Sequence, residues 1–508
     1  MSDKSTLLDA FTNTFRGSAD SSIRLPMVSI LGFTGHRKLS DPAHLRHLIR
    51  DFLARYKASS ATVCGVSSLA EGGDLLFAES CIEMGIPLQV LLPFSREMFR
   101  ADFDSETWAH VESVLRNAID VEVTDNGGNR EECYYECGIE TVQRSQTMLA
   151  LWDGEPSRGL GGTGEIVQFA RSMGKPVTWI HSGTGAIEFL GTNCSAMGMN
   201  DSELDFLNSL PEPACTDRSD TPIDLAECWL EKMDAAASRF APRLRRMAAI
   251  PMVVTSAVAV LTLIPVARHA APLWSVGCGV LGLLAAALPA LIHLKRQQLD
   301  WARSRSAAEV CRSMLALWKT PGRYDVLDEE TVPELGGMIR AFQYLKMEDR
   351  RTSATDLEQF KSEYRRNRFQ HQIKYFLRQA ARSSAVDRRL SRVIRFCVYI
   401  GIALMFARGI LSLLSPPASP GKLWITVLAA LLFEVATIAR ALIVVYDIER
   451  RQARYRELSQ NLKLWEQEFS ALQTWPSVLR VSARIERTLL AELLEWRSLA
   501  KHTKLPRK

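Results

Sequence analysis

The sequence lacks the cysteine patterns that bind metal ions. Its ten cysteines are scattered, with no C-x-x-C pair and no histidine–cysteine cluster at metal-ligand spacing. Cys133 and Cys137 could share a helix face, but two thiols without further ligands make a weak metal site, so ordinary buried thiols are expected. The scattered thiols fit a reducing cytoplasm. We expect no metal and no cofactor.

The amino-terminal segment Met1 to Asp20 lacks the apolar stretch of a signal peptide, so the leading domain is expected to stay on the side of the membrane where it is made. A large excess of charge of one sign is also missing, since 62 Lys and Arg face 57 Asp and Glu. Basic residues crowd beside apolar segments, as in Arg243–Arg246 and Arg450–Arg451. This distribution favours a membrane-flanking role and argues against a nucleic-acid partner.

The second half of the sequence contains four long apolar stretches. The mean hydropathy of the whole chain, −0.03, does not reveal them because the rest of the chain is polar. Each is long enough to cross a hydrocarbon core of roughly 30 Å at about 1.5 Å per residue. The second half of the chain therefore predicts an all-α membrane part with four transmembrane helices in two hairpins: Met247 to Val266 with Leu273 to Leu294, and Val393 to Leu414 with Leu423 to Tyr446.

The loops predict the orientation of these helices. The connections Ala267 to Pro272 and Ser415 to Lys422 are short and carry one basic residue each, whereas the other flanks are rich in arginine. By the positive-inside rule both connections lie outside and both termini are cytoplasmic. We expect a multi-pass protein of the bacterial inner (cytoplasmic) membrane, with the lipid bilayer as a partner.

The leading domain alternates apolar runs with helical patterns, which predicts an α/β Rossmann-like, doubly wound parallel sheet. The expected strands are Met27 to Phe33, Ala61 to Val66, Leu88 to Phe94, Val121 to Thr124, Met148 to Trp152 and Val177 to His181. The expected helices are Pro42 to Tyr56, Gly73 to Met84, Glu106 to Ala118, Glu132 to Ser145 and Glu165 to Met173.

Three glycine-rich turns follow strands of this sheet, where such folds bind ligands. Two of them open helices whose amide groups and dipole attract phosphate. Together they predict a site for a nucleotide or another phosphorylated ligand, with these candidate residues: Gly32, Thr34, Gly35, His36, Arg37, Ser67, Ser68, Glu71, Gly72, Gly73, Asp74, Asp153, Gly161, Gly162, Thr163, Gly164 and Glu165.

Three of these carboxylates also have structural interpretations. Asp74 and Glu165 stand at helix starts, where acidic side chains commonly cap the helix. Asp153 is suited to binding a ribose hydroxyl or to shaping its own turn.

The runs Gly65–Asp74, Leu92–Phe94 followed by Asp102–Phe103, and Gly161–Glu165 resemble the SLOG superfamily, which relates the Smf/DprA DNA-uptake proteins to the LOG phosphoribohydrolases. The resemblance covers about Val28 to His181. It implies nucleotide binding by the Gly-Gly-Thr-Gly-Glu turn, and in the LOG enzymes the matching acid, here Glu165, takes part in cleaving the N-glycosidic bond. The sequence departs from the P-G-G-x-G-T-x-x-E spacing of those enzymes.

Long polar helices are expected on the cytoplasmic side of the hairpins. Asp349 to Arg395 contains no glycine or proline and carries the apolar stripe of an amphipathic helix, and comparable helices are expected over Gln297 to Trp318 and Asp447 to Phe469. This architecture, from about Ala236 to Lys501, resembles the SLATT group of two-transmembrane effectors associated with SLOG proteins.

The two resemblances together imply a bacterial antiphage membrane effector. In such a protein a SLOG-like sensor recognises a nucleotide-derived second messenger of the cyclic-nucleotide or ADP-ribose type, and a homo-oligomeric pore or membrane disruption then stops growth. The alternative is a membrane-anchored hydrolase of the LOG type with Glu165 as its acid or base.

The second hairpin carries the residues that would line a pore or form a gate. Arg408 lies toward the outer end of the third span and Glu434 near the middle of the fourth, where a lipid-facing charge costs about 3 kcal/mol or more. A structural ion pair between the two is the competing interpretation. The first hairpin has small residues and no central charge, which favours a role in assembly.

The predicted domain organisation has five parts. Residues 1–26 form an amino-terminal extension and 27–182 the nucleotide-binding domain, followed by a connector over 183–235. The first hairpin with its cytoplasmic helices occupies 236–347, and the second occupies 348–508.

Overall fold

The computed structural model describes residues 24–59, 62–125, 127–157, 159–191, 201–211, 221–239, 254, 276–277, 279–283, 294–321, 332–350, 356–414 and 420–502. The chain forms two compact units. The α/β unit comprises Met1–Lys232 and Leu317–Ala354, and the helical unit comprises Met233–Ala316 and Thr355–Lys508. The segment Leu317–Ala354, expected beside the hairpins, thus belongs to the α/β unit.

The α/β unit is built on a seven-stranded sheet of order β4-β3-β2-β1-β5-β6-β7. All six strands predicted from sequence are present and parallel. Five of them are largely buried apolar runs of the kind that such sheets require, whereas the edge strand β4 is partly exposed. The seventh strand pairs antiparallel with β6 and was not predicted. The strands are β1 (Val28–Gly35), β2 (Thr62–Ser67), β3 (Leu88–Leu92), β4 (Asp120–Val123), β5 (Thr147–Trp152), β6 (Val177–His181) and β7 (Ile187–Leu190).

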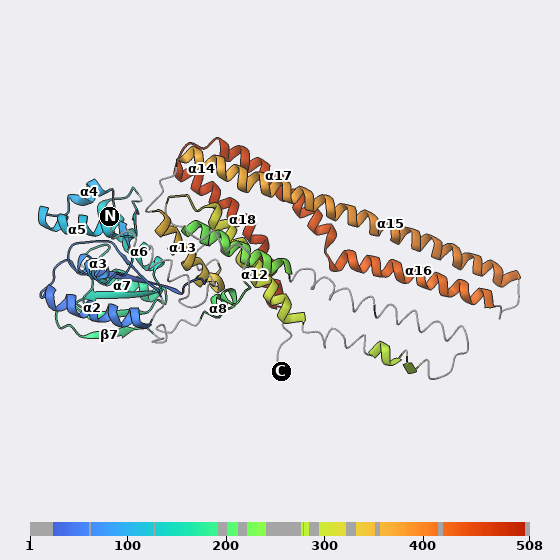
Figure 1. Ribbon diagram of the computed structural model, residues 1–508, viewed down its shortest axis with the longest axis horizontal. Coiled ribbons are helices and arrows are strands. Elements are labelled where there is room, and N and C mark those ends of the chain that lie inside the picture. The colour runs from blue at the N-terminus through green and yellow to red at the C-terminus, as the bar shows by residue number, and fades with distance from the viewer. Residues whose placement is uncertain are drawn as a thin grey trace. The chain divides into compact units, whose positions relative to one another are not determined.

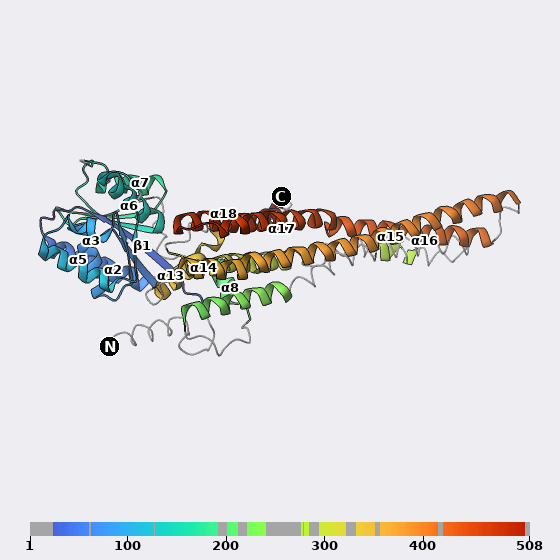
Figure 2. The ribbon, with the colours of Figure 1, turned by 90° about the horizontal axis from the view of Figure 1, so that it is seen from above.

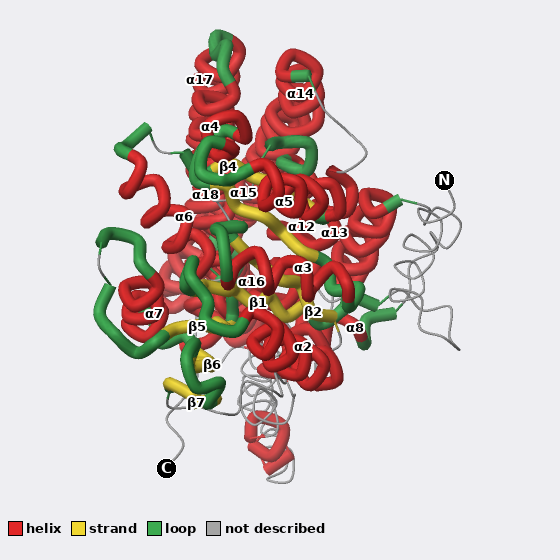
Figure 3. Tube along the Cα trace, turned by 90° about the vertical axis from the view of Figure 1, so that its left-hand side faces the viewer, coloured by secondary structure: helices red, strands yellow, loops and turns green. Residues whose placement is uncertain are grey.

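Helices cover both faces of the sheet, as the doubly wound fold predicts, and the strands (yellow in Figure 3) lie between them. One core joins α2, α3 and α5 to the sheet around the stacked rings of Phe33 and Phe77, and a second core joins α6 and α7 around Val142 and Ile166. The helices are α2 (Pro42–Ser59), α3 (Gly73–Glu83), α4 (Arg96–Arg100), α5 (Ser105–Asn117), α6 (Arg130–Arg144), α7 (Thr163–Ser172) and α8 (Ser202–Asn208). The short helices α4 and α8 were not predicted.

A later part of the chain completes the α/β unit. The short 3₁₀ helix η2 (Pro333–Leu335) leads into α13 (Gly336–Arg350), which packs against β1. The buried Arg340 side chain donates a 2.9 Å hydrogen bond from Nε to the carbonyl oxygen of Val28. This contact is made at the start of β1, at the opposite end of the strand from the glycine-rich turn.

The helical unit contains α12 (Leu294–Ala316), α14 (Leu357–Tyr364), the π-helical turn η3 (Arg365–Gln370), α15 (His371–Leu414), α16 (Pro420–Val445), α17 (Ile448–Ser470) and α18 (Trp475–His502). Helices α15 and α16 run side by side as a long hairpin (Figures 1 and 2). The amphipathic helix expected over Asp349 to Arg395 is present beyond the start of α14, but the π turn interrupts it. Residues 351–355 of that segment lie outside the described residues.

The spacing of the apolar stripe explains the π turn. Phe360 and Tyr364 are four residues apart, as are Phe369 and Ile373, but Tyr364 and Phe369 are five apart. A regular α-helix would carry Phe369 about 100° past the buried face, whereas one wider turn keeps both rings buried.

Two helices of the described chain are long and apolar enough to cross a membrane, and they contain the second predicted hairpin. Only 11% of the apolar window is buried in the first and 28% in the second, so neither is the core helix of this unit. Phe396, Tyr399, Phe406 and Leu413 are among the exposed apolar side chains. The first predicted hairpin, from Met247 to Leu294, lies almost wholly outside the described residues.

The expectation of buried thiols is confirmed for Cys133 and Cys137. The described residues contain no cluster of three or more potential metal ligands. Cys228, in contrast, is disulfide-bonded, which a reducing cytoplasm does not favour.

Candidate functional site

A cavity of about 990 Å³ opens at the carboxyl ends of β1 and β5. Successive connections leave the sheet in opposite directions at these two neighbouring strands, so the cavity occupies the switch point at which folds of this kind bind ligands. Its walls come from the turns after β1, β2, β5 and β6, from Asp102 and from one side of α6.

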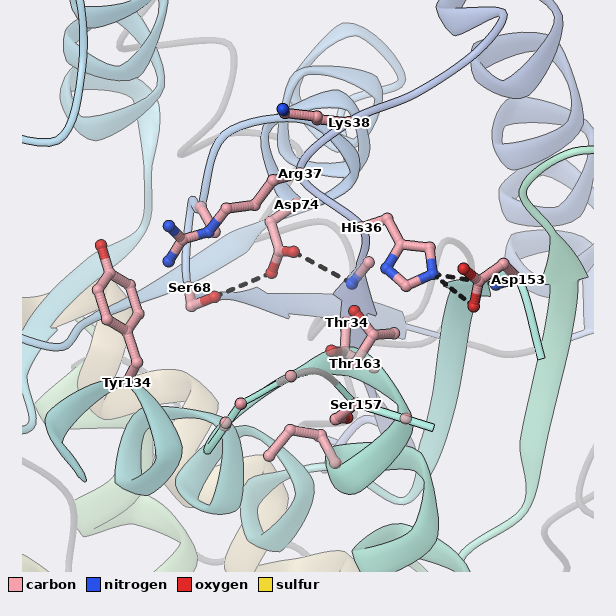
Figure 4. Close-up of a pocket in the computed structure, with 18 of the residues that line it drawn as sticks. Thr34, His36, Arg37, Lys38, Ser68, Asp74, Tyr134, Asp153, Ser157 and Thr163 are labelled. Carbon is pink, nitrogen blue, oxygen red and sulfur yellow. Dashed lines mark hydrogen bonds and ion pairs between the residues drawn. The ribbon is translucent and has the colours of Figure 1, made fainter. Parts of the chain in front are cut away.

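The first two turns are joined by a buried carboxylate. Asp74, on the first turn of α3, accepts hydrogen bonds from the Gly35 amide at 3.1 Å and from the Ser68 hydroxyl at 2.9 Å (Figure 4). Burial raises the pKa of Asp74 to about 7, although both hydrogen bonds and the charge of Arg37 oppose this shift. The side chain therefore holds the two turns together and does not cap its own helix.

The second turn also depends on glycine. Gly72 has a φ of +89°, and a Cβ at this position would lie 2.2 Å from the carbonyl oxygen of Arg37. The close approach of the two turns is therefore possible only without a side chain at residue 72.

His36 connects the first turn to the third. Its Nε2 lies 3.0 Å from Asp153 Oδ1 and accepts a hydrogen bond from the Asp153 amide at 3.1 Å (Figure 4). Slight burial acts to raise the pKa of Asp153, but the hydrogen bond from the Glu155 amide and the nearby His36 outweigh this and lower it. Asp153 shapes its turn, as one interpretation predicted, while its carboxylate still lines the cavity.

The third turn brings the amino terminus of α7 to the cavity. Gly162 is the N-cap and has no side chain to engage the first amides. The Glu165 amide donates to Ser157 Oγ at 2.8 Å and the Ile166 amide to Gly162 O at 3.2 Å. Among the described residues, nothing accepts a hydrogen bond from the amides of Thr163 and Gly164, which are suited to an anion.

Thr163 adds a hydroxyl to this amide pair. Its side chain lines the cavity and is buried, and none of the described residues is a hydrogen-bond partner for it. Figure 4 places Thr163 beside Thr34, so two hydroxyl groups from different turns stand close to the helix start.

Glu165 does not line this cavity. Its Oε2 accepts a 2.8 Å hydrogen bond from the Gly161 amide, and the side chain lines a separate hollow of about 660 Å³ that includes Arg171. This geometry favours the capping interpretation of Glu165, because the carboxylate stabilises its own turn and lies outside the main cavity.

The predicted residues therefore divide into two groups. Those that line the cavity are Thr34, Gly35, His36, Arg37, Ser68, Asp74, Asp153, Gly161, Gly162, Thr163 and Gly164. Those that do not line it are Gly32, Ser67, Glu71, Gly72, Gly73 and Glu165. Gly32 is packed against Met148, and the Ser67 hydroxyl donates to the Asp74 carbonyl oxygen.

The sequence did not predict the wall formed by α6. Tyr134 donates a hydrogen bond to Asp102, which also pairs with Arg130. The guanidinium of Arg37 lies over the Tyr134 ring, 4.8 Å from its centroid, and makes no ion pair with any described residue. Asp102 stands in one of the motifs that resemble the SLOG superfamily, which was the one available signal for this wall.

In the hairpin, Arg408 and Glu434 are not paired with each other. A Cβ on Gly401 would lie 2.9 Å from the Phe433 ring, which sets the register of α15 against α16. Arg408 is seven residues closer to the loop than Gly401, a rise of about 10 Å along α15. The buried Arg408 Nε has no hydrogen-bond partner among the described residues. The ion pair of the competing interpretation is therefore not formed within one chain, and a pair between subunits stays a prediction.

No family model matches this sequence, and neither does any curated protein.

Proposed function

We propose that the protein is a bacterial membrane effector in which a SLOG-like domain senses a nucleotide-derived second messenger and opens a homo-oligomeric pore or disrupts the inner membrane, which arrests growth during phage infection. The observation that carries the proposal is an α/β cavity of about 990 Å³ at a helix start whose N-cap residue has no side chain, in the same chain as an exposed apolar hairpin. A cavity of this size is large enough for a nucleotide.

The hairpin supports the membrane part of the proposal. Its exposed apolar surface supports two helices that cross the bilayer, and the proposal puts Arg408 nearer the outer face and Glu434 deeper. Both termini are placed in the cytoplasm.

Titration of the purified full-length protein with ADP-ribose, AMP and cyclic di-AMP tests the sensor. At least one of them is expected to bind, and Thr163→Val and Arg37→Ala are expected to weaken that binding roughly tenfold or more, because each loses a contact to an anion. Arg171→Ala is the matched control, since Arg171 lies at the other end of α7 and outside the cavity. Equal affinity in all four proteins would sink the proposed site.

Dye-filled liposomes containing the protein test the effector. The nucleotide that binds best is expected to release the dye from wild-type liposomes and not from liposomes with Thr163→Val. Liposomes that stay tight with saturating nucleotide contradict a pore.

A nucleotide hydrolase remains the second candidate, and one observation favours it. Asp74 is a buried carboxyl in the cavity with a pKa of about 7, which suits an acid or base at neutral pH. Water would add at C1′ of the ribose while the N-glycosidic bond breaks. Asp74 would give its proton to the leaving base, and the proton that the water loses would return to the Asp74 carboxylate. Release of free base from AMP by the wild-type protein, abolished in Asp74→Asn and retained in Glu165→Gln, would establish this activity.

A further inference from the structure

The helical unit encloses a polar cluster that the proposed function does not use. It consists of Ser313 on α12, Tyr364 on α14, Arg368 in the π turn and Glu486 on α18, and we call these four residues the latch cluster. All four are buried, and Glu486 has no exposed surface. Three segments far apart in the sequence therefore meet at one carboxylate.

Glu486 accepts hydrogen bonds from each of the other three residues. Its Oε1 accepts from Tyr364 at 2.7 Å and from Arg368 Nε at 2.8 Å. Its Oε2 accepts from Ser313 at 2.6 Å and forms a second, shorter bond with Arg368. Burial acts to lower the pKa of Arg368, but the charge of Glu486 and its hydrogen bonds to the guanidinium raise it. Arg368 therefore remains charged.

This cluster is a poor device for stability alone. Removing two charges from water costs several kcal/mol per ion, and well-packed apolar residues often stabilise such a site equally well. The arginine is also incompletely satisfied, since Nη1 of Arg368 has no hydrogen-bond partner in the described chain. A directional contact between particular residues is what the charged pair provides and an apolar pair does not.

The contact is made within the π turn. Arg365–Gln370 contain one residue more than a regular α-helical turn would need to keep Tyr364 and Phe369 on one face. Relaxation of this turn to α-helix would rotate α14 against α15 by about 100° and shift it by about 1.5 Å. Arg368, held by Glu486, opposes that change.

The π turn leads without interruption into the apolar helix. Helix α15 begins at His371 and continues to Leu414, and its second half is one of the two segments able to cross a membrane. A rotation at the turn is therefore transmitted along one continuous helix toward the bilayer.

We propose that the latch cluster holds the membrane-crossing helix in its π-turned register against α12 and α18, and that loss of the Arg368–Glu486 pair releases that helix to rotate. This proposal does not depend on nucleotide binding. In the resting state, the buried Arg368–Glu486 pair keeps the helical unit in this arrangement.

Hydrogen–deuterium exchange of the full-length protein in detergent tests the latch. Glu486→Gln keeps the shape of the side chain and removes its charge, so the amides of Arg365–Gln370 are expected to exchange roughly tenfold faster or more. Glu468→Gln is the matched control. It removes the carboxylate of an exposed pair with Arg484, which also joins α17 to α18, and is expected to leave exchange in the π turn unchanged.

The double variant Arg368→Met with Glu486→Leu separates loss of the ion pair from loss of the fold. It replaces the pair with apolar groups of similar size, so the unit is expected to stay folded while losing the directional contact. Without any nucleotide, liposomes with either latch variant are expected to release dye several-fold faster than those with wild-type protein or Glu468→Gln. Liposomes as tight as wild type with a folded double variant, or unchanged exchange in Glu486→Gln, overturn the proposal.

Discussion

Asp74 in the α/β unit and Glu486 in the helical unit are both carboxylates removed from water, with exposed fractions of 3% and 0%. Their partners differ. Asp74 is held by two neutral donors, the Gly35 amide and the Ser68 hydroxyl, and lines an open cavity. Glu486 is held by the guanidinium of Arg368 inside a closed helix packing. The first arrangement leaves a carboxyl group that can gain or lose a proton near neutral pH, and the second fixes a charge that only a conformational change can expose.

The largest expected difference between the two carboxylates is the pH dependence of folding stability that Asp74 causes. Its pKa is raised from 3.8 to about 7, so the folded state binds a proton that the unfolded state releases. Stability from this group is fully present below pH 3.8 and is lost as pH rises to about 7, by an amount of the order of 4 kcal/mol.

Asp74→Asn removes this loss, because the amide stays neutral at every pH. Thermal unfolding of the α/β unit in the full-length protein is therefore expected to change less between pH 5 and 8 in Asp74→Asn than in wild type. Glu486→Gln is the contrasting variant and should not flatten that profile. Parallel pH profiles for wild type and Asp74→Asn would remove the distinction between the two carboxylates.

Glu165 is an intermediate case, since its carboxylate accepts one backbone hydrogen bond and lies outside the main cavity. Glu165→Gln keeps an oxygen that can accept from the Gly161 amide but removes the charge, so a loss of about 1 kcal/mol is expected. The measurement is the thermal midpoint of the α/β unit, with Glu155→Gln as the control in the same loop. A loss of stability as large as that expected on removing a fully buried charge would show that Glu165 does more than cap its turn.

Much of the α/β unit was predictable because most of its strands are buried on both faces and read as apolar runs. Strand β7 escaped because Ile187–Leu190 is short and half exposed, with no such run. The turns that carry Gly35, Asp74 and Thr163 could be placed at one edge because parallel strands end together. The hydrogen bond from the Gly35 amide to Asp74 could not be predicted, because it depends on how closely the two turns approach each other.

The α6 wall was not predictable for a related reason. Arg130 and Tyr134 lie on a helix whose sequence is merely amphipathic, and only packing brings its first turn to the cavity. The π turn had a visible signal in the five-residue gap between Tyr364 and Phe369, which a search for regular helical spacing passes over. The register that separates Arg408 from Glu434 follows from the Gly401–Phe433 contact, which no local pattern contains.

Glu434 provides the smallest expected effect and extends the comparison into the hairpin. It is half-buried and makes no ion pair with any described residue, so in the proposed oligomer it resembles Asp74 more than Glu486. A ring of such carboxylates would attract cations, because rings of acidic side chains give pores their cation preference. Glu434→Gln is therefore expected to lower the cation-over-anion permeability ratio several-fold and to leave nucleotide affinity unchanged.

Reversal potentials in planar bilayers under a KCl gradient measure this ratio. Glu457→Gln is the matched control, since Glu457 is exposed on α17, beyond the apolar segment of α16. A Glu434→Gln pore with wild-type selectivity would place this carboxylate away from the conducting path. The charge of Glu434 would then have to be compensated by a basic side chain, as Arg368 compensates the charge of Glu486. Arg408 lies too far along α15 to do so within the same chain, so the basic side chain would come from a neighbouring subunit.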